Sequence, residues 1–379
     1  MAKSKTSYSD LIQTSGTFEV VGLVTGTKSD RFYSEKQTTP KQKVNSQGKT
    51  YMTKSMPNRV VNFGVEFEKG KVLYLSLTGL PRDNVYFSGK QNPNDDKNTT
   101  VTVPWAERLN FNQEGMRLIG VNLGLSKKVD ETGKQTTSND SKTWTEFDAC
   151  EVLNRELEDG MSVYCRGKID YQSYKNKNGD TVRIKKFVPT QISLTSNPVE
   201  LDKLTEENPP VSNFTQTIVL TDIEMSQEDK CAYINGYVVN YADMQPTQFK
   251  TYNQKLAKTL SSVCKKDYVG IDVYGHIDVI KSEEEVEVDD GWGEANTMKR
   301  VNAPTTREMI VIGADPKTLD EEGYTKKLVE DALNVLNKNK KAEEQFGKDE
   351  AKEANDWGTP NLEIAKSEDD DEDWSDWGE

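Results

Sequence analysis

Hydrophobic and polar positions alternate along most of the chain from Gly16 to about Ile312, and β-branched residues are frequent there. A period of two places apolar side chains on one face of an extended segment, as in a half-buried β-strand. We therefore predict a mainly β protein. The predicted strands are Phe18–Thr27, Arg59–Glu66, Val72–Thr78, Arg117–Ser126, Met161–Tyr171, Thr181–Leu194, Thr215–Leu220, Ala232–Tyr241, Tyr268–Ile280 and Met309–Ile312.

Three segments have a helical pattern instead. Short helices are predicted at Asp148–Leu157 and around Gln254–Cys264. A longer one falls within residues 316–346, where acids come early and lysines late, as the helix dipole favours. Beyond Gly347 no periodicity remains, and the acidic composition predicts disorder.

The sequence contains a short internal repeat. CRGKID (Cys165–Asp170) and VYGHID (Val273–Asp278) both place Gly-x-Ile-Asp inside a long alternating strand. In each half, strands are followed by a short helix and then a long strand pair, which is the order of a five-stranded OB barrel. The glycine in each long strand permits the bend that such barrels need. We expect two OB-fold-like barrels with short helices, a C-terminal helix and a disordered acidic tail.

A Pro-Pro segment, ENPPVSN, separates the two halves of the chain. The expected organisation is an N-terminal arm (1–14), an OB-type domain with a long basic insertion (15–200), a linker (201–213), a second OB-like domain (214–315), the C-terminal helix (316–346) and the acidic, tryptophan-containing tail (347–379).

The negative charge of the protein is concentrated at its end. From Glu343 to Glu379 there are fifteen acids and three lysines, whereas the other 342 residues hold 48 acids and 46 bases. The formal net charge of −14 is therefore a property of the tail and does not exclude a nucleic-acid partner. The last residues, EDDDEDWSDWGE, set two indoles among carboxylates. They predict a protein-interaction motif formed by Asp373, Trp374, Asp376 and Trp377.

Several function classes fit the sequence poorly. No apolar run approaches the ~20 residues that span a bilayer, and the start of the chain, MAKSKTSYSDL, lacks the apolar stretch of a secretory signal. We expect a cytoplasmic protein whose four cysteines, none in CxxC spacing, are buried reduced thiols. A single histidine leaves little room for a His-based triad or a multi-His metal site. We expect no enzyme activity, no cofactor and no metal.

The long strand pair carries candidate binding chemistry. From Arg166 to Lys186 there are seven bases and two acids, interleaved with aromatic residues. Aromatic rings can stack on nucleobases for ~1–3 kcal/mol each, while cations follow the phosphates. The alternative is that another layer covers this face. The strands are predicted to place these side chains on one outward surface, extended by the turn: Tyr164, Arg166, Lys168, Tyr171, Tyr174, Lys175, Lys177, Arg183, Lys185 and Phe187.

A second basic and aromatic segment lies between the first two predicted strands. Thr27–Arg59 holds eight bases and two acids, with many Gly, Ser, Thr, Asn and Gln residues. It is typical of a flexible arm that closes over a nucleic-acid strand, and the alternative is a merely soluble loop. Its candidate contacts are Arg31, Phe32, Tyr33, Lys43, Lys49, Tyr51 and Lys54.

The second half has different outward residues at the equivalent strand. Asp272, Tyr274, His276 and Asp278 are predicted to point outward where the first half has Arg166 and Lys168. Carboxylates repel phosphate, so we expect this face to bind nucleic acid weakly or to serve protein contacts.

The segment WTEFDACEVLNRELEDGMSVYCRGKIDYQSYKNKNGDTVRIKKFVPTQISL (Trp144–Leu194) resembles the core of bacterial and phage single-stranded-DNA-binding proteins. The shared features are an aromatic-rich strand, a short helix, a strand with Gly160, Val163 and Gly167, and a basic hairpin with an Asn-Gly tip. The preceding Arg117–Thr143 resembles that family's strand and long DNA-contacting loop. An acidic C-terminal tail is also typical of the family, although its bacterial members end in Pro-Phe and this chain ends in Trp-Gly-Glu.

The resemblance implies a non-catalytic, largely sequence-independent single-stranded-DNA-binding protein of phage replication or recombination, within the host cytoplasm. It places Tyr164, Arg166, Lys168, Tyr171, Tyr174 and Lys175 on the DNA path. It also implies that the tail competes with DNA and recruits replication proteins. A protein-interaction scaffold and an RNA-binding protein remain alternatives, and the oligomeric state is open.

Overall fold

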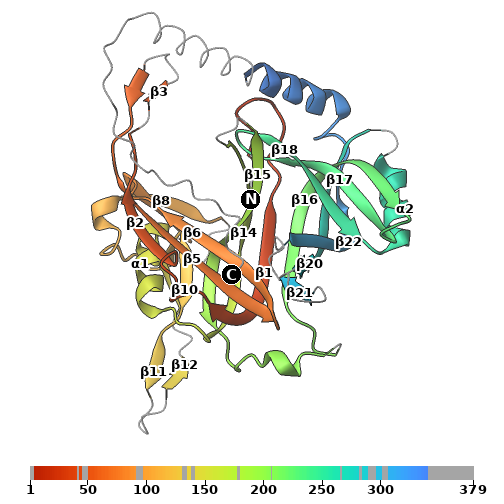
Figure 1. Cartoon of the computed structure of the whole chain (residues 1–379). Coiled ribbons are helices and arrows are strands. Elements are labelled where there is room, and N and C mark those ends of the chain that lie inside the picture. The colour runs from red at the N-terminus through yellow and green to blue at the C-terminus, as the bar shows by residue number, and fades with distance from the viewer. Residues whose placement is uncertain are drawn as a thin grey trace, which may run out of the picture. The chain divides into compact units, whose positions relative to one another are not determined.

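The structure, a computed structural model, forms two compact units (Figure 1). One is Ser15–Thr215, and the other combines Met1–Thr14 with Gln216–Glu379. The described residues are 4–40, 42–44, 50–90, 97–129, 135–137, 141–176, 180–205, 207–264, 267–280, 284–288, 296–300 and 306–339.

Five strands of the unit Ser15–Thr215 pair in a ring. They are β1 (Gly16–Thr25), β5 (Pro57–Glu68), β6 (Lys71–Gly79), β14 (Ser162–Lys175) and β15 (Thr181–Leu194). Antiparallel pairing joins β1 to β5, β5 to β6, β1 to β14, and β14 to β15. Strands β6 and β15 run parallel and meet at the single pair Leu75 and Phe187. This is the order of a partly open OB barrel.

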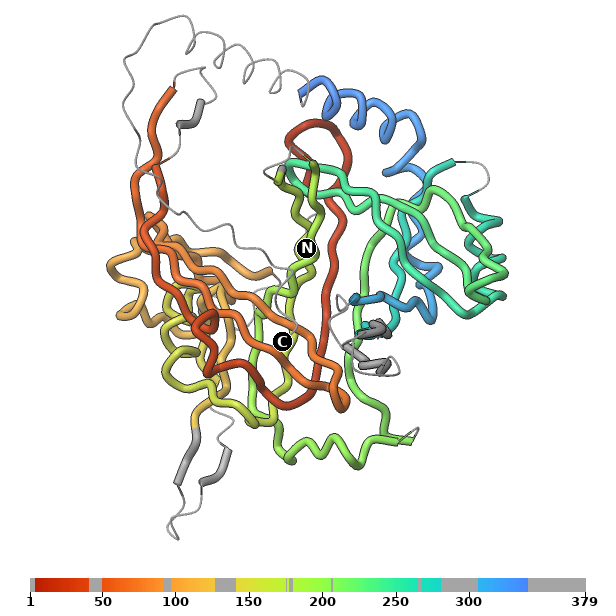
Figure 2. Tube along the Cα trace, viewed as in Figure 1, coloured from red at the N-terminus to blue at the C-terminus, as the bar shows by residue number. Residues whose placement is uncertain are grey.

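Two insertions depart from this ring (Figure 2). The arm, between β1 and β5, holds β2 (Tyr33–Gln37), which pairs with β5, and the hairpin of β3 (Gln42–Val44) and β4 (Thr50–Met52). The longer insertion, between β6 and helix α1 (Glu146–Glu156), begins with a three-stranded sheet that we call the inserted sheet. The insertion comprises β7 (Asn84–Gly89), β8 (Thr99–Pro104), the 3-10 helix η1 (Trp105–Glu107), β9 (Met116–Leu118), β10 (Val121–Gly124), β11 (Lys127–Val129), β12 (Gln135–Thr137) and β13 (Lys142–Trp144).

The second unit repeats the ring. Its strands are β16 (Ser212–Ser226), β17 (Cys231–Val239), β18 (Met244–Thr251), β19 (Val269–Ile280) and β22 (Thr306–Asp320), with α2 (Gln254–Cys264) between β18 and β19. Pairing runs from β16 to β17, β18, β22 and β19 and returns to β16, with β18 and β22 parallel. The remaining elements are η2 (Leu201–Lys203), the pair β20 (Glu284–Val288) and β21 (Asn296–Arg300), and a helix over residues 326–339.

Gly167 and Gly275 explain the repeated Gly-x-Ile-Asp sequence. A Cβ on Gly167 would lie 2.0 Å from the carbonyl oxygen of Val188, and one on Gly275 would lie 1.8 Å from that of Ile310. The ladder shifts register beside each glycine. Only a residue without a side chain allows the backbones to approach this closely, and the β-bulge bends the strand there.

The N-terminal segment supplies part of the second unit's core. Leu11 is fully buried and packs in a cluster that also contains Tyr324, Val329 and Val239. The Tyr324 hydroxyl donates to the carbonyl of Ile12 at 3.1 Å. This segment therefore has a defined place in the fold, because it fills core volume that the second ring leaves open.

The structure confirms the predicted fold class: a mainly β protein with two OB-like rings, short helices and a C-terminal helix. The predicted tail (347–379) lies outside the described residues. Strand β18 was not predicted, because Pro246 and polar neighbours in MQPTQFKT interrupt the alternation. The predicted single strand Arg117–Ser126 is two strands, β9 and β10.

The four cysteines are free thiols. Cys150, Cys165 and Cys231 are buried as predicted, whereas Cys264 is only half-buried. No helix among the described residues has the length and hydropathy needed to cross a membrane.

Replacing Leu11 by Ala should destabilise the second unit by about 2–5 kcal/mol, because it opens a cavity in a packed core. Hydrogen exchange measured by mass spectrometry on the full chain should show reduced protection in β17 and not in β14. The control is Lys5→Ala, whose side chain is 68% exposed in a surface ion pair, with an expected change of about 0.5 kcal/mol or less. Unchanged protection of β17 in L11A would contradict the assignment of residues 4–14 to this core.

Candidate nucleic-acid interface

The register of the β14–β15 hairpin determines which side chains share a face. Lys175 is paired with Thr181, Tyr171 with Lys185, and Lys168 with Val188. Residues directly opposite each other in a ladder lie on the same face of the sheet. The predicted single surface is therefore wrong. From Lys168 to the turn, even-numbered residues of β14 lie opposite even-numbered residues of β15, so the odd-numbered Arg183, Lys185 and Phe187 fall on the other face. One face carries Tyr164, Arg166, Lys168 and Tyr174, and the other carries Tyr171, Arg183, Lys185 and Phe187.

Three of the predicted aromatic contacts belong to the interior. Tyr171 is 5% exposed, Phe187 is 3% exposed, and Phe32 in the arm is 6% exposed. The Phe187 ring packs edge-on against Phe18, with 5.3 Å between centroids. The prediction that Tyr171 and Phe187 lie on an outward surface is wrong, and Phe32, a predicted contact of the arm, is buried as well. Burial of an aromatic side chain gains hydrophobic free energy that exposure to water forgoes. Arg183 and Lys185, nearer the hairpin tip, remain exposed.

Arg166 and Lys168 remain exposed on the outer face of β14. We call their surroundings the β14 depression, a shallow hollow lined by Thr17, Asn122, Ser141, Arg166, Gly167, Lys168, Thr190 and Gln191. Thr190 is the extra residue of the bulge opposite Arg166 and Gly167. This hollow offers cations and uncharged hydrogen-bonding groups to a ligand.

One carboxylate, Glu19, borders these cations. It accepts a hydrogen bond from the Tyr164 hydroxyl at 3.1 Å and lies 3.5 Å from the Arg166 guanidinium. Burial and the bond to Glu19 raise the pKa of Tyr164, so its hydroxyl stays protonated. No carboxylate within the described ranges pairs with Lys168, which leaves its full charge for a ligand.

The remaining predicted residues are distributed over the arm and the hairpin tip. Tyr51 is 48% exposed and Tyr174 is 44% exposed. Arg31 and Lys54 are exposed, while the half-buried Tyr33 donates its hydroxyl to Glu35 at 2.9 Å. Lys43 lies in β3 and Lys175 ends β14. The residues outside the described part of the chain are Lys49, Lys177, Asp373, Trp374, Asp376 and Trp377.

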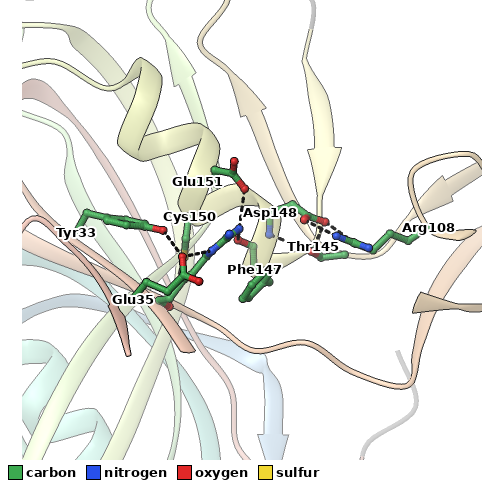
Figure 3. A network of polar contacts seen from close by, with 9 residues as sticks. Tyr33, Glu35, Arg108, Thr145, Phe147, Asp148, Cys150 and Glu151 are labelled. Carbon is green, nitrogen blue, oxygen red and sulfur yellow. Dashed lines mark hydrogen bonds and ion pairs between the residues drawn. The ribbon is translucent and has the colours of Figure 1, made fainter. Parts of the chain in front are cut away.

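Arg59 of β5 has a structural role despite its charge (Figure 3). Its guanidinium donates to Glu35 of β2 at 2.9 Å and to Glu151 of α1 at 2.7 Å. The same group lies 3.9 Å from the centroid of the Phe147 ring. With only 15% of its side chain exposed, Arg59 is neutralised, and it connects the arm to the ring and to α1.

Arg108 makes a corresponding contact for the longer insertion (Figure 3). It donates to both carboxylate oxygens of Asp148, each at 2.8 Å, and its guanidinium lies 4.2 Å from the centroid of the Trp105 ring. Thr145 caps α1 by accepting from the Asp148 amide and donates its hydroxyl to the same carboxylate. Burial would raise the pKa of Asp148, but the bonds from Arg108 and Thr145 outweigh burial and hold it below its ordinary value.

The structure also contains a cleft that sequence reasoning missed, between the inserted sheet and β13. We call it the insertion cleft; it is lined by Leu109, Phe111, Arg117, Lys142 and Trp144, among other residues. The Lys142 ammonium lies 4.0 Å from the centroid of the Trp144 ring. The Lys-Thr-Trp spacing in β13 places both residues on one face of a strand and was the available signal.

The equivalent face of the second unit has no exposed cation on β19. Tyr274 is 42% exposed, His276 is exposed, and Ile312, the extra residue at the bulge, is 55% exposed. Tyr274 and His276 point outward as predicted. Binding by this face would depend on apolar and aromatic contacts rather than on phosphate attraction.

The buried thiols are poor nucleophiles. Burial raises the pKa of Cys150 to about 12 and raises that of Cys165 as well. Both therefore remain protonated at neutral pH. Within the described ranges, no cluster of three or more His, Cys, Asp or Glu side chains is arranged to hold a metal ion.

Asp148→Asn should lower the free energy of unfolding at pH 7 by about 1–3 kcal/mol, because Arg108 loses its carboxylate partner. Since the folded-state pKa of Asp148 lies below the unfolded value of about 3.9, this stabilisation is present above about pH 4 and is lost as the pH falls through the folded pKa. The two proteins should therefore converge in acid. Urea unfolding at pH 7, 5 and 3, followed by tryptophan fluorescence, measures this difference.

The control is Asp202→Asn, because Asp202 makes an ion pair with Lys69 while 84% of its side chain is exposed. A change of about 0.5 kcal/mol or less is expected at each pH. An equal loss of stability for D148N at pH 7 and pH 3 would show that packing, and not the ion pair, accounts for the effect.

Comparisons with known proteins identify the family of the chain. No curated protein sequence matches it. A solved structure of a deletion variant of the single-stranded-DNA-binding protein from Thermus aquaticus aligns with 80% of this chain and 94% of its own, with 12% identity and a TM-score of 0.33. The family model YorF matches residues 91–349, which is more than half of the chain. The protein belongs to the YorF family.

Proposed function

We propose that the unit Ser15–Thr215 binds single-stranded DNA without catalysis and with little sequence preference. The observation that carries the proposal is the β14 depression, where exposed Arg166 and Lys168 lie beside uncharged hydrogen-bonding side chains, with Glu19 as a neighbouring carboxylate. Cations that follow a phosphate backbone bind all sequences alike.

The two protruding segments support the same function. OB barrels that bind oligonucleotides use the loop between their first two strands and the loop between their last two strands. Here those loops are the arm and the tip of the β14–β15 hairpin. The exposed rings Tyr51 and Tyr174 lie on them and can stack on unpaired bases. On the opposite face of the hairpin, Arg183 and Lys185 can contact a strand that passes around its tip.

The proposed phosphate contacts are Arg166, Lys168, Arg183, Lys185, Lys43, Lys54, Lys175 and Arg31, and the proposed base contacts are Tyr51, Tyr164 and Tyr174. Lys49 and Lys177, which lie outside the described residues, are proposed as phosphate contacts from the sequence alone. Tyr33, bonded to Glu35, positions the arm. The buried rings Phe32, Tyr171 and Phe187 are not among the proposed contacts.

The acidic tail adds regulation to this proposal. Its carboxylates imitate phosphates, so it competes with DNA for the cations of the unit Ser15–Thr215. Asp373, Trp374, Asp376 and Trp377 form a motif that recruits replication or recombination proteins, as in the family that the sequence resembles. This role suits a phage-encoded protein acting in the cytoplasm of its host.

Arg166→Ala combined with Lys168→Ala should weaken binding to oligo-dT roughly three- to tenfold at low salt, because two phosphates are no longer neutralised. The slope of log affinity against log salt should become less steep by about 0.7 for each of these phosphates. Fluorescence anisotropy at several salt concentrations measures both quantities. Parallel titrations with oligo-rU and duplex DNA test the preference for single-stranded DNA.

The control is Lys69→Ala combined with Lys203→Ala, two exposed lysines that pair with Asp202 and Glu200. Their removal should leave the affinity and the salt slope unchanged. If the parent protein bound no nucleic acid, the proposal would fail and a protein-interaction scaffold would take its place. Tighter binding to oligo-rU than to oligo-dT would reassign the protein to RNA.

Removing Lys348–Glu379 eliminates thirteen carboxylates and three lysines. This should tighten DNA binding, most clearly at low salt, where charge competition is least screened. The matched variant Trp374→Ala with Trp377→Ala retains every carboxylate and should bind DNA as the parent does. Unchanged or weaker binding by the truncated protein would refute the competition.

A further inference from the structure

The insertion cleft has two walls from different parts of the unit Ser15–Thr215. The inserted sheet and the loop after η1 provide Leu109, Phe111 and Arg117, and β13 provides Lys142 and Trp144. Both walls belong to one compact unit, so their relative position is part of its fold.

The cleft exposes apolar surface. Leu109 is 58% exposed, and the half-buried Phe111 packs against Phe87 with 4.4 Å between ring centroids. Exposed apolar surface with a polar rim is typical of binding sites, because covering it removes the cost of hydrating it. A flat, partly apolar group such as a nucleobase suits these two side chains.

The charge of the cleft favours an anion. Asp148 is its carboxylate, and Arg108 neutralises it through two hydrogen bonds of 2.8 Å. Two exposed cations remain, Arg117 and Lys142. No carboxylate in the described part of the chain pairs with either of them. A ligand with a negative charge beside an apolar face therefore matches both properties of the cleft.

The insertion cleft adjoins the β14 depression. Asn122 and Ser141 line both, so a chain-like ligand held by Arg166 and Lys168 can pass along these two residues into the cleft. A small free ligand would not require this connection.

The inserted sheet is held in place before any ligand binds. Besides the Arg108–Asp148 pair, Trp105 packs edge-on against Phe147 at the start of α1, with 6.1 Å between centroids. A wall fixed by such contacts loses little conformational freedom on binding.

We propose that the insertion cleft holds a nucleotide of the single strand that occupies the β14 depression. Its base packs against Leu109 and Phe111, and its phosphate lies between Arg117 and Lys142. The inserted sheet thereby lengthens the DNA path beyond the five-stranded ring. This inference rests on the proposed binding of single-stranded DNA by the unit Ser15–Thr215.

The phosphate contact is tested in the full-length protein with Arg117→Ala combined with Lys142→Ala. Anisotropy with oligo-dT should show roughly three- to tenfold weaker binding at low salt and a salt slope less steep by about 0.7 for each phosphate that is no longer neutralised. The control is Arg82→Ala combined with Lys69→Ala, two exposed cations of the same unit that do not line the cleft. The control should bind as the parent does.

The base contact is tested with Leu109→Ser, a change at an exposed position that preserves the core. It should weaken binding to oligo-dT roughly threefold, which is less than the loss of a whole base-stacking side chain would cause, because Phe111 remains. Its affinity for a strand with abasic residues should equal that of the parent, because the phosphates are retained.

The outcomes separate this inference from the proposed function. If the parent fails to bind oligo-dT, the proposed function falls and this inference falls with it. If the parent binds and the Arg117 and Lys142 variant matches its control, DNA binding stands and the insertion cleft is excluded from the path. An equal effect of L109S on normal and abasic strands would overturn the base contact.

Discussion

Two arginines, Arg59 and Arg108, hold the unit Ser15–Thr215 together where its insertions meet the ring of strands. Arg59 ties β2 and α1 to β5, and Arg108 ties the inserted sheet to the capped start of α1. A guanidinium forms several directed bonds and also stacks on a ring, so one side chain can orient three elements. The arm and the inserted sheet, which carry proposed DNA contacts, are positioned by these two interactions. Both arginines are paired with carboxylates, so the proposed ligand contacts are made by other cations such as Arg166 and Lys168.

The two units share an architecture and differ on their surfaces. Gly167 of β14 and Gly275 of β19 occupy equivalent bulges in equivalent strands. In each ring of strands, a carbonyl of the partner strand leaves no space for a Cβ at this position. The outward neighbours of these glycines are free of that constraint. Arg166 and Lys168 flank the first, whereas Tyr274 and His276 flank the second. The close approach of the two backbones therefore requires glycine in both units, whereas the exposed side chains next to it differ in charge.

Local pattern was sufficient for the strands of the two rings, with the exception of β18. Helix α2 and strand β15 have the bounds predicted from periodicity. The failures occurred where local pattern is weak. Strand β18 contains a proline and few apolar residues and is held by its neighbours β17 and β22. The inserted sheet lies among Asn, Asp, Pro and Gly residues that indicate loops.

The sequence by itself determined the class of the protein, the order of its elements, the location of its charge and the basic hairpin, because these depend on neighbouring residues. Only the tertiary structure decided which faces of that hairpin are exposed. The pairing of Tyr171 with Lys185 sends Tyr171 and Phe187 inward and leaves Arg166 and Lys168 outside. The structure also brought Arg117 and Lys142 together on one cleft. Register and long-range packing are set by contacts between distant segments, and alternation along a single strand does not encode them.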